Sequence, residues 1–158
     1  MTVDPIVTSR RALLLGLVAS VSAAACGGSS PTDPSPTAQT WVADVPFQTI
    51  DLEVGTGDEV VNGTKIRVDY VAWLYSTATS DNKGTIMDTS LQGRGPFEYV
   101  VGAGTVIAGW ERGIPGMRVL GVRRLIVPPA LAYGSTGNGS IPANATMIFE
   151  VRVNEIVS

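Results

Sequence analysis

The residue types that most often carry out protein chemistry are few in this chain. It has no histidine and a single cysteine, Cys26. These counts exclude a Ser-His-Asp triad, a histidine-ligated zinc site, a four-cysteine metal cluster and an internal disulfide. The chemistry that remains uses carboxylates, tyrosines and arginines, or an apolar surface that acts without proton transfer.

The charge balance excludes one further class of function. Lys and Arg total 11 and Asp and Glu total 14, which gives a net charge of −3 and no basic stripe. A general electrostatic grip on nucleic acid is therefore not expected. The length of 158 residues fits one domain with some additional chain.

The N-terminal segment has the layout of a secretory signal. Arg10 and Arg11 precede an apolar run at 12–25 that ends in small residues. The run is too short and too rich in Ala and Ser to favour a membrane span, so we expect residues 1–25 to be a cleaved signal peptide. A transmembrane anchor is the alternative, and the arginine pair leaves both the general secretory and the twin-arginine export routes open.

The single cysteine, Cys26, directly follows this apolar run. Cys26 follows three alanines and precedes two glycines, a position that resembles the lipobox of bacterial lipoproteins, although Ala23 stands where leucine is usual. We expect Cys26 to be lipidated and the protein to be exported to the periplasm and attached to a membrane through that lipid alone. Ordinary cleavage after Ala25 is the alternative. Residues 26–40 are rich in Gly, Ser and Pro and predict a disordered linker, so the folded domain should span 41–158.

Periodicity within this domain predicts mainly strands. Polar and apolar residues alternate along 65–74, which predicts a half-buried strand with Tyr70 on its core side and Trp73 and Tyr75 exposed on the other. The segment 147–154 alternates in the same way. Shorter strands are expected at 48–54, 86–88, 97–101 and 119–127.

Only one segment reads as a helix. Val106–Gly113 has helical character, with Thr105 as a possible N-cap and Gly113 as its end. Gly-rich turns between the strands indicate antiparallel pairing. The predicted class is α+β, with one short helix against a twisted antiparallel sheet.

Six segments, taken together and in order, resemble one family, the FKBP-type peptidyl-prolyl cis-trans isomerases. The resemblance covers about 49–157. The segments are Val68-Asp69-Tyr70, Met87-Asp88-Thr89-Ser90, Gly95-Pro96-Phe97-Glu98-Tyr99, the 106–113 helix sequence, Ala132-Tyr133-Gly134 and the 141–149 sequence IPANATMIF.

This resemblance implies a half-barrel sheet around the helix and an apolar pocket between them. It makes Trp110 the pocket floor and Tyr133 a hydroxyl donor to a substrate carbonyl. It gives Asp88 the role of pocket carboxylate. Catalytic roles are expected for Tyr70, Asp88, Phe97, Trp110 and Tyr133, and substrate-binding roles for Met87, Val106, Ile107, Ile141 and Phe149.

The implied activity is rotation about Xaa-Pro bonds of unfolded or partly folded exported proteins, with no cofactor and no metal. A macrolide of the tacrolimus or rapamycin type is an expected ligand, and a monomer is the expected state. The alternative functions are a weakly active binding module or holdase with the same pocket and a structural lipoprotein. The holdase is suggested by Met87, which stands where the family usually has phenylalanine, and by the outward Trp73 and Tyr75. The polar stretch 76–85 predicts an enlarged loop beside the pocket.

Overall fold

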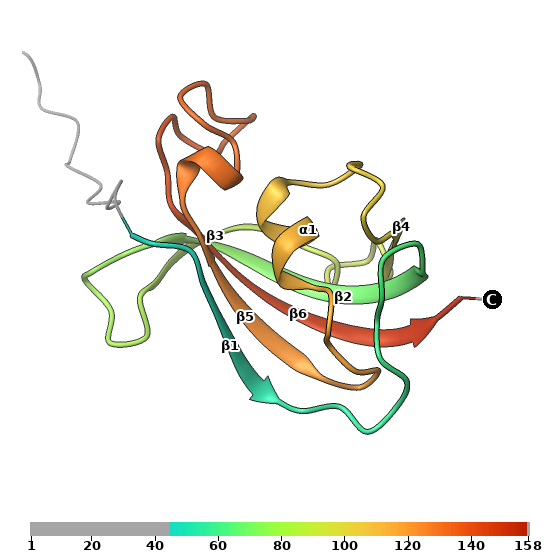
Figure 1. Ribbon diagram of the computed structural model, residues 1–158. Coiled ribbons are helices and arrows are strands. Elements are labelled where there is room, and N and C mark those ends of the chain that lie inside the picture. Colours follow the sequence, from blue (N-terminus) through green and yellow to red (C-terminus); the bar gives the residue numbers. More distant parts are fainter. Residues whose placement is uncertain (1–44, 158) are drawn as a thin grey trace, which may run out of the picture. The chain divides into compact units, whose positions relative to one another are not determined.

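The computed structural model describes residues 45–157, which form one sheet and one short α-helix (Figure 1). The predicted signal peptide, the linker at 26–40 and Cys26 lie outside the described residues. Within residues 45–157, no helix is long and apolar enough to cross a membrane. The elements are β1 (Gln48–Glu53), β2 (Lys65–Tyr75), β3 (Lys83–Thr89), β4 (Phe97–Val100), α1 (Ala108–Gly113), β5 (Val122–Val127), the 3₁₀ turn η1 (Pro129–Leu131) and β6 (Met147–Ile156).

The sheet is antiparallel throughout. Its order is β1-β5-β6-β2-β3, and β4 pairs with the first half of β2. The two long strands β2 and β6 lie at its centre and pair from Ile66 opposite Ile156 to Leu74 opposite Met147. One short helix against an antiparallel sheet confirms the predicted α+β class. Alternation along β2 and β6 directs one set of apolar side chains to the face that α1 covers.

The helix lies very close to the inner face of the sheet. A Cβ atom added at Gly109 would lie 2.4 Å from Cγ1 of Val127, and one added at Gly113 would lie 2.6 Å from Cδ2 of Leu125. Only glycine permits this spacing, so two glycines set the depth at which Trp110 enters the core.

The helix begins later than predicted. Its first residue is Ala108, and its N-cap is Ile107, which makes no side-chain capping bond; the predicted cap at Thr105 is wrong. The helix ends at Gly113: Ile114, its C-cap, still has helical backbone, but the next residue, Pro115, has no backbone N–H with which to continue the hydrogen-bond pattern.

The outer face of the sheet is less exposed around its aromatics than predicted. Trp73 and Tyr75 are half-buried, and Nζ of Lys83 lies 4.6 Å from the centre of the Trp73 ring. Lys83 also forms an ion pair with Glu150 at 2.7 Å. A cation therefore covers part of the indole ring on this face.

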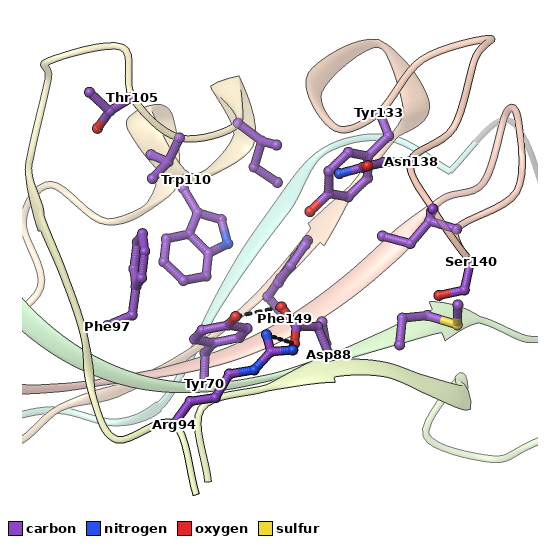
Figure 2. Close-up of a pocket in the computed structure, with 16 residues that line it drawn as sticks. Tyr70, Asp88, Arg94, Phe97, Thr105, Trp110, Tyr133, Asn138, Ser140 and Phe149 are labelled. Atoms are coloured by element: carbon purple, nitrogen blue, oxygen red, sulfur yellow. Dashed lines mark hydrogen bonds and ion pairs between the residues drawn. The ribbon is translucent and has the colours of Figure 1, made fainter. Parts of the chain in front are cut away.

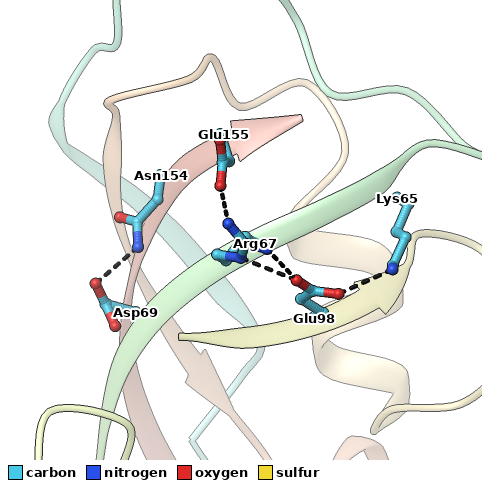
Figure 3. Close-up of polar contacts among 6 residues, drawn as sticks. All are labelled: Lys65, Arg67, Asp69, Glu98, Asn154 and Glu155. Carbon is cyan, nitrogen blue, oxygen red and sulfur yellow. Dashed lines mark hydrogen bonds and ion pairs between the residues drawn. The ribbon is translucent and has the colours of Figure 1, made fainter. Parts of the chain in front are cut away.

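Ion pairs on the same outer face fasten the short strand β4 (Figure 3). Arg67 of β2 binds Glu98 of β4 through Nε at 2.9 Å and also binds Glu155 of β6. Lys65 adds a second cation to Glu98 at 2.8 Å. Because β4 has only four residues and one strand partner, these side chains supplement its few backbone hydrogen bonds.

Candidate functional site

A cavity of about 600 Å³ opens between α1 and the inner face of the sheet (Figure 2). One end is lined by aromatic and aliphatic side chains, and the other end carries the polar groups. Its lining comes from β2, β3, β4, α1, β6 and three loops, and comprises Tyr70, Ala72, Met87, Asp88, Arg94, Phe97, Thr105, Val106, Ile107, Trp110, Tyr133, Asn138, Gly139, Ser140, Ile141 and Phe149.

The structure brings together all ten residues that the sequence assigned to a pocket. Six further residues also line the cavity. Among these, Asn138, Gly139 and Ser140 belong to the loop that precedes Ile141. Arg94 was missed because it lies in an irregular loop where no periodicity predicts its direction, and Thr105 was interpreted as a helix cap instead.

Aromatic rings form the floor and walls of the apolar end. Trp110 is only 4% exposed, and its ring meets those of Tyr70 and Phe149 almost at right angles, with centroids 5.3 and 5.7 Å apart. Phe97 closes the side at 6.2 Å from Trp110. These edge-to-face contacts hold the rings in place and leave a flat apolar surface that suits a small aliphatic ring.

A hydrogen-bonded carboxylate lies beside this surface. The Tyr70 hydroxyl donates to Oδ2 of Asp88 at 2.6 Å, while Oδ1 accepts from the Thr89 amide at 2.9 Å and from Arg94 at 3.2 Å. Burial, followed by this hydrogen bond to Asp88, raises the pKa of Tyr70 well above its ordinary value. The phenol therefore remains a neutral donor at physiological pH.

Tyr133 presents its hydroxyl to the cavity from the segment that follows η1 (Figure 2). No residue in 45–157 forms a hydrogen bond with this hydroxyl. Burial, and then the nearby Asp88 carboxylate, raise the pKa of Tyr133, so the group stays protonated. It is a half-buried donor available to a ligand carbonyl.

The rim opposite the helix is a tight loop. Asn138 and Ile141 exchange backbone hydrogen bonds, from N–H to O at 3.0 Å and in return at 2.8 Å. Gly137 has a φ of +72°, and a Cβ there would lie 2.3 Å from the Ile141 carbonyl oxygen. Ile141 is therefore pinned at the rim, with 9% of its surface exposed.

The polar loop beside β3 does not contribute to the cavity. None of residues 76–85 is among the lining residues, and Lys83–Thr85 belong to β3 rather than to a loop. The expected loop therefore contributes no residue to the lining, and β3 begins at Lys83, earlier than the sequence indicated. In the described part of the chain, no group of three His, Cys, Asp or Glu side chains is arranged to hold a metal ion.

Comparisons with known proteins agree on one family. The sequence model described as FKBP-type peptidyl-prolyl cis-trans isomerase matches residues 57–154. A FK506-binding protein of Neisseria meningitidis serogroup A is 41% identical over 107 residues, which cover 67% of this chain and 92% of that protein.

Solved structures agree with this match. AtFKBP13 superposes with a TM-score of 0.61 and 32% identity, covering 70% of this chain and 93% of that one. FkpA from Escherichia coli gives a TM-score of 0.59 at 28% identity, over 70% of this chain and 47% of that one. Other relatives are far longer: the match spans 6% of FK506-binding protein 5 of Dictyostelium discoideum and 20% of FK506-binding protein 4 of Chaetomium thermophilum.

Proposed function

Because the chain belongs to the FKBP-type peptidyl-prolyl cis-trans isomerases, we propose that its pocket accelerates rotation about Xaa-Pro bonds in exported polypeptides. The observation that carries this proposal is the cavity itself. It combines a rigid aromatic surface, formed by Trp110, Tyr70 and Phe149, with the hydroxyl of Tyr133, which is available as a hydrogen-bond donor.

The reaction makes few chemical demands on the protein. Resonance across the amide opposes rotation with a barrier of about 18–20 kcal/mol. No covalent bond to carbon forms or breaks, so neither a nucleophile nor a metal is required. As the bond twists, conjugation is lost, the nitrogen becomes pyramidal and the charge separation of the planar amide decreases.

The two ends of the cavity suit that change. An apolar surface beneath the proline ring favours the less polar twisted state over the planar ground state, which is differential binding of the transition state. The Tyr133 hydroxyl holds the carbonyl of the preceding residue while the proline ring rests on Trp110. A barrier lowered by about 4–6 kcal/mol would accelerate rotation roughly 10³- to 10⁴-fold.

The test is an isomerisation assay with the full-length chain and a short Xaa-Pro peptide. We expect accelerated cis-to-trans conversion, and its loss in Trp110→Ala and Asp88→Ala variants whose circular dichroism is unchanged. Arg124→Gln, which removes an ion pair on the outer face, should leave the rate unchanged. A wild-type rate equal to the uncatalysed one would contradict the proposal.

Two finer properties belong to the same proposal. The relatives carry the name FK506-binding protein, which supports a macrolide of that type as a ligand of the pocket. The signal-like N-terminus supports export and attachment through Cys26. Mass spectrometry of the mature N-terminus would test this: a diacylated cysteine is expected, and a chain that begins with an unmodified Cys26 or retains residues 1–25 would refute it.

The holdase alternative has less support than the sequence suggested. It relied in part on an open aromatic surface at Trp73, but Lys83 lies over that ring. Met87 does line the cavity in place of an aromatic residue. A flexible thioether adapts to ligands of different shape, so it changes which substrates fit and does not by itself abolish the pocket.

A further inference from the structure

A series of hydrogen bonds outside the pocket reaches the backbone of Tyr70. Ser90, which is 3% exposed, follows β3 and accepts the Tyr70 backbone N–H through Oγ at 3.0 Å. The same hydroxyl donates to Oδ1 of Asp69 at 2.9 Å. The other oxygen of Asp69 accepts from the side-chain amide of Asn154 on β6 at 2.7 Å (Figure 3). We call Ser90, Asp69 and Asn154 the outer hydrogen-bond chain.

The outer hydrogen-bond chain lies next to the point where the pairing of β2 with β3 ends. The regular register between β2 and β3 ends at Val71 opposite Thr89. Beyond it, the Ser90 amide and the Thr89 hydroxyl both donate to the Tyr70 carbonyl, at 3.1 and 3.0 Å. The end of β3 is thus fastened to β2 at Tyr70, chiefly by side chains, and Asp88 lies only two residues before Ser90.

The geometry links this fastening to the pocket. Successive residues of a strand point to opposite faces, so Tyr70 faces the cavity while Asp69 faces outward. A shift of either strand end by a fraction of an ångström changes the 2.6 Å contact between the Tyr70 hydroxyl and Asp88. None of the three residues of the outer hydrogen-bond chain is among those lining the cavity.

We propose that Ser90, Asp69 and Asn154 are positioning residues, which set the Tyr70–Asp88 pair for catalysis without touching the substrate. This inference rests on the proposed isomerase function. Removal of the Ser90 hydroxyl leaves the buried Tyr70 N–H unpaired and takes one donor from Asp69, so the end of β3 moves to satisfy them. The effect reaches the substrate through the hydrogen bond between the Tyr70 hydroxyl and Asp88.

A double-mutant cycle separates positioning from general stabilisation. We expect Ser90→Ala in the full-length chain to lower kcat/KM about tenfold, and Ser90→Thr, which keeps the hydroxyl, to restore most of it. In a Tyr70→Phe background the further loss on Ser90→Ala should be less than twofold. Equal fold losses in both backgrounds, or no loss in the wild-type background, would overturn the proposal.

A second variant and a control cover the case in which Ser90→Ala does not fold. Asn154→Ala acts at the far end of the outer hydrogen-bond chain and should lower kcat/KM about threefold, again only when Tyr70 is present. Arg124→Gln breaks the ion pair with Glu150 on the same face, at 2.7 Å, without reaching Ser90. It should change kcat/KM by less than twofold; a loss equal to that of Asn154→Ala would overturn the proposal.

A measurement independent of activity keeps this inference distinct from the proposed function. The Tyr70 hydroxyl proton is donated to the Asp88 carboxylate across an oxygen-to-oxygen distance of 2.6 Å, so it should give a slowly exchanging downfield proton signal by NMR. Ser90→Ala should broaden or shift that signal. A wild-type chain without isomerase activity refutes the proposed function, whereas an unchanged hydroxyl signal in Ser90→Ala refutes the positioning role.

Discussion

The Tyr133 hydroxyl is the clearest single group on which binding to a substrate carbonyl depends. Because it forms no hydrogen bond within 45–157, removing it leaves no buried protein group unpaired. We expect Tyr133→Phe to lower kcat/KM roughly three- to tenfold, since a neutral hydrogen bond contributes about 0.5–1.5 kcal/mol. The melting temperature should stay within about a degree of the wild type. An unchanged kcat/KM would show that this hydroxyl does not bind the substrate.

Leu120 is a residue in a conformation that suits glycine. Its φ is +71°, and its side chain is 46% exposed, so the fold gains little from burying it. A residue other than glycine is strained by about 1–2 kcal/mol in the left-handed region, and substitution by glycine relieves this strain. Glycine also makes the unfolded chain more flexible, which offsets about 0.4–1 kcal/mol of the gain. We expect Leu120→Gly to raise the free energy of unfolding by about 0.5–1 kcal/mol.

Denaturant titration is the measurement, and Leu120→Ala is the matched control. The alanine variant removes the same side chain but keeps the strain, so it should not be stabilised. A glycine variant less stable than the wild type would mean that the Leu120 side chain contributes more through packing than its exposure indicates.

At the scale of elements, the spacing between α1 and the sheet is the feature most sensitive to substitution. Gly109 lies against Val127 with no room for a methyl group. We expect Gly109→Ala to lower the free energy of unfolding by about 1–3 kcal/mol through overpacking, which outweighs the gain in helix propensity of about 1 kcal/mol. Activity should also fall, because Trp110 follows directly in the same helix.

Arg112 offers a control on the same helix, since it is exposed. Arg112→Ala should change the free energy of unfolding by no more than about 0.5 kcal/mol. Thermal melts of both variants, with the isomerisation assay beside them, check this prediction. A Gly109→Ala variant as stable as the wild type would show that Val127 moves aside without strain.

At the scale of the whole molecule, the acid limit of stability comes from paired carboxylates. Hydrogen bonds from Lys65 and Arg67 hold the pKa of Glu98 below its ordinary 4.5. Burial alone would raise the pKa of Glu150, but hydrogen bonds led by that from Lys83 outweigh it and lower the pKa. A lowered pKa contributes stability that is present above the unfolded value and is lost as the pH falls through the folded one, so destabilisation should begin below about pH 4.5.

The alkaline limit comes from tyrosines. Burial raises the pKa values of Tyr70, Tyr99 and Tyr133 above 10.0, so the folded state keeps protons that the unfolded chain releases above that pH. Stability is therefore lost as the pH rises beyond 10. Since residues 45–157 contain no histidine and no cysteine, we expect a free energy of unfolding that is flat from about pH 5.5 to 9. Denaturant midpoints across pH 3–11 test both limits, and a step between pH 6 and 8 would contradict them.

The fold was largely predictable because polar and apolar residues alternate along most of its central strands β2 and β6. Ile66, Val68 and Leu74 of β2 are buried as the alternation predicts. The length of β3 and the start of α1 were not, since bulges interrupt the β2–β3 register and the helix carries no side-chain cap.

The pocket residues were predictable only through the resemblance to the family. Trp110 and Phe149 are large apolar residues of the kind that usually forms a hydrophobic core, and both are buried in the core. Arg94 and the outer hydrogen-bond chain were not predicted. Their partners are distant in the sequence or lie in loops, so only the three-dimensional register shows that Asn154 of β6 reaches Asp69 of β2.

The burial of Trp110 divides the pocket into two parts that tolerate change differently. The floor belongs to the hydrophobic core, so a substitution there alters the packing of the whole domain. Asn138 and Ser140 lie on the rim, where they form no side-chain hydrogen bond with other described residues. Surface substitutions of this kind usually change stability by less than about 0.5 kcal/mol. New ligand preferences can therefore be selected at the rim, one residue at a time, while the floor that serves the reaction is kept.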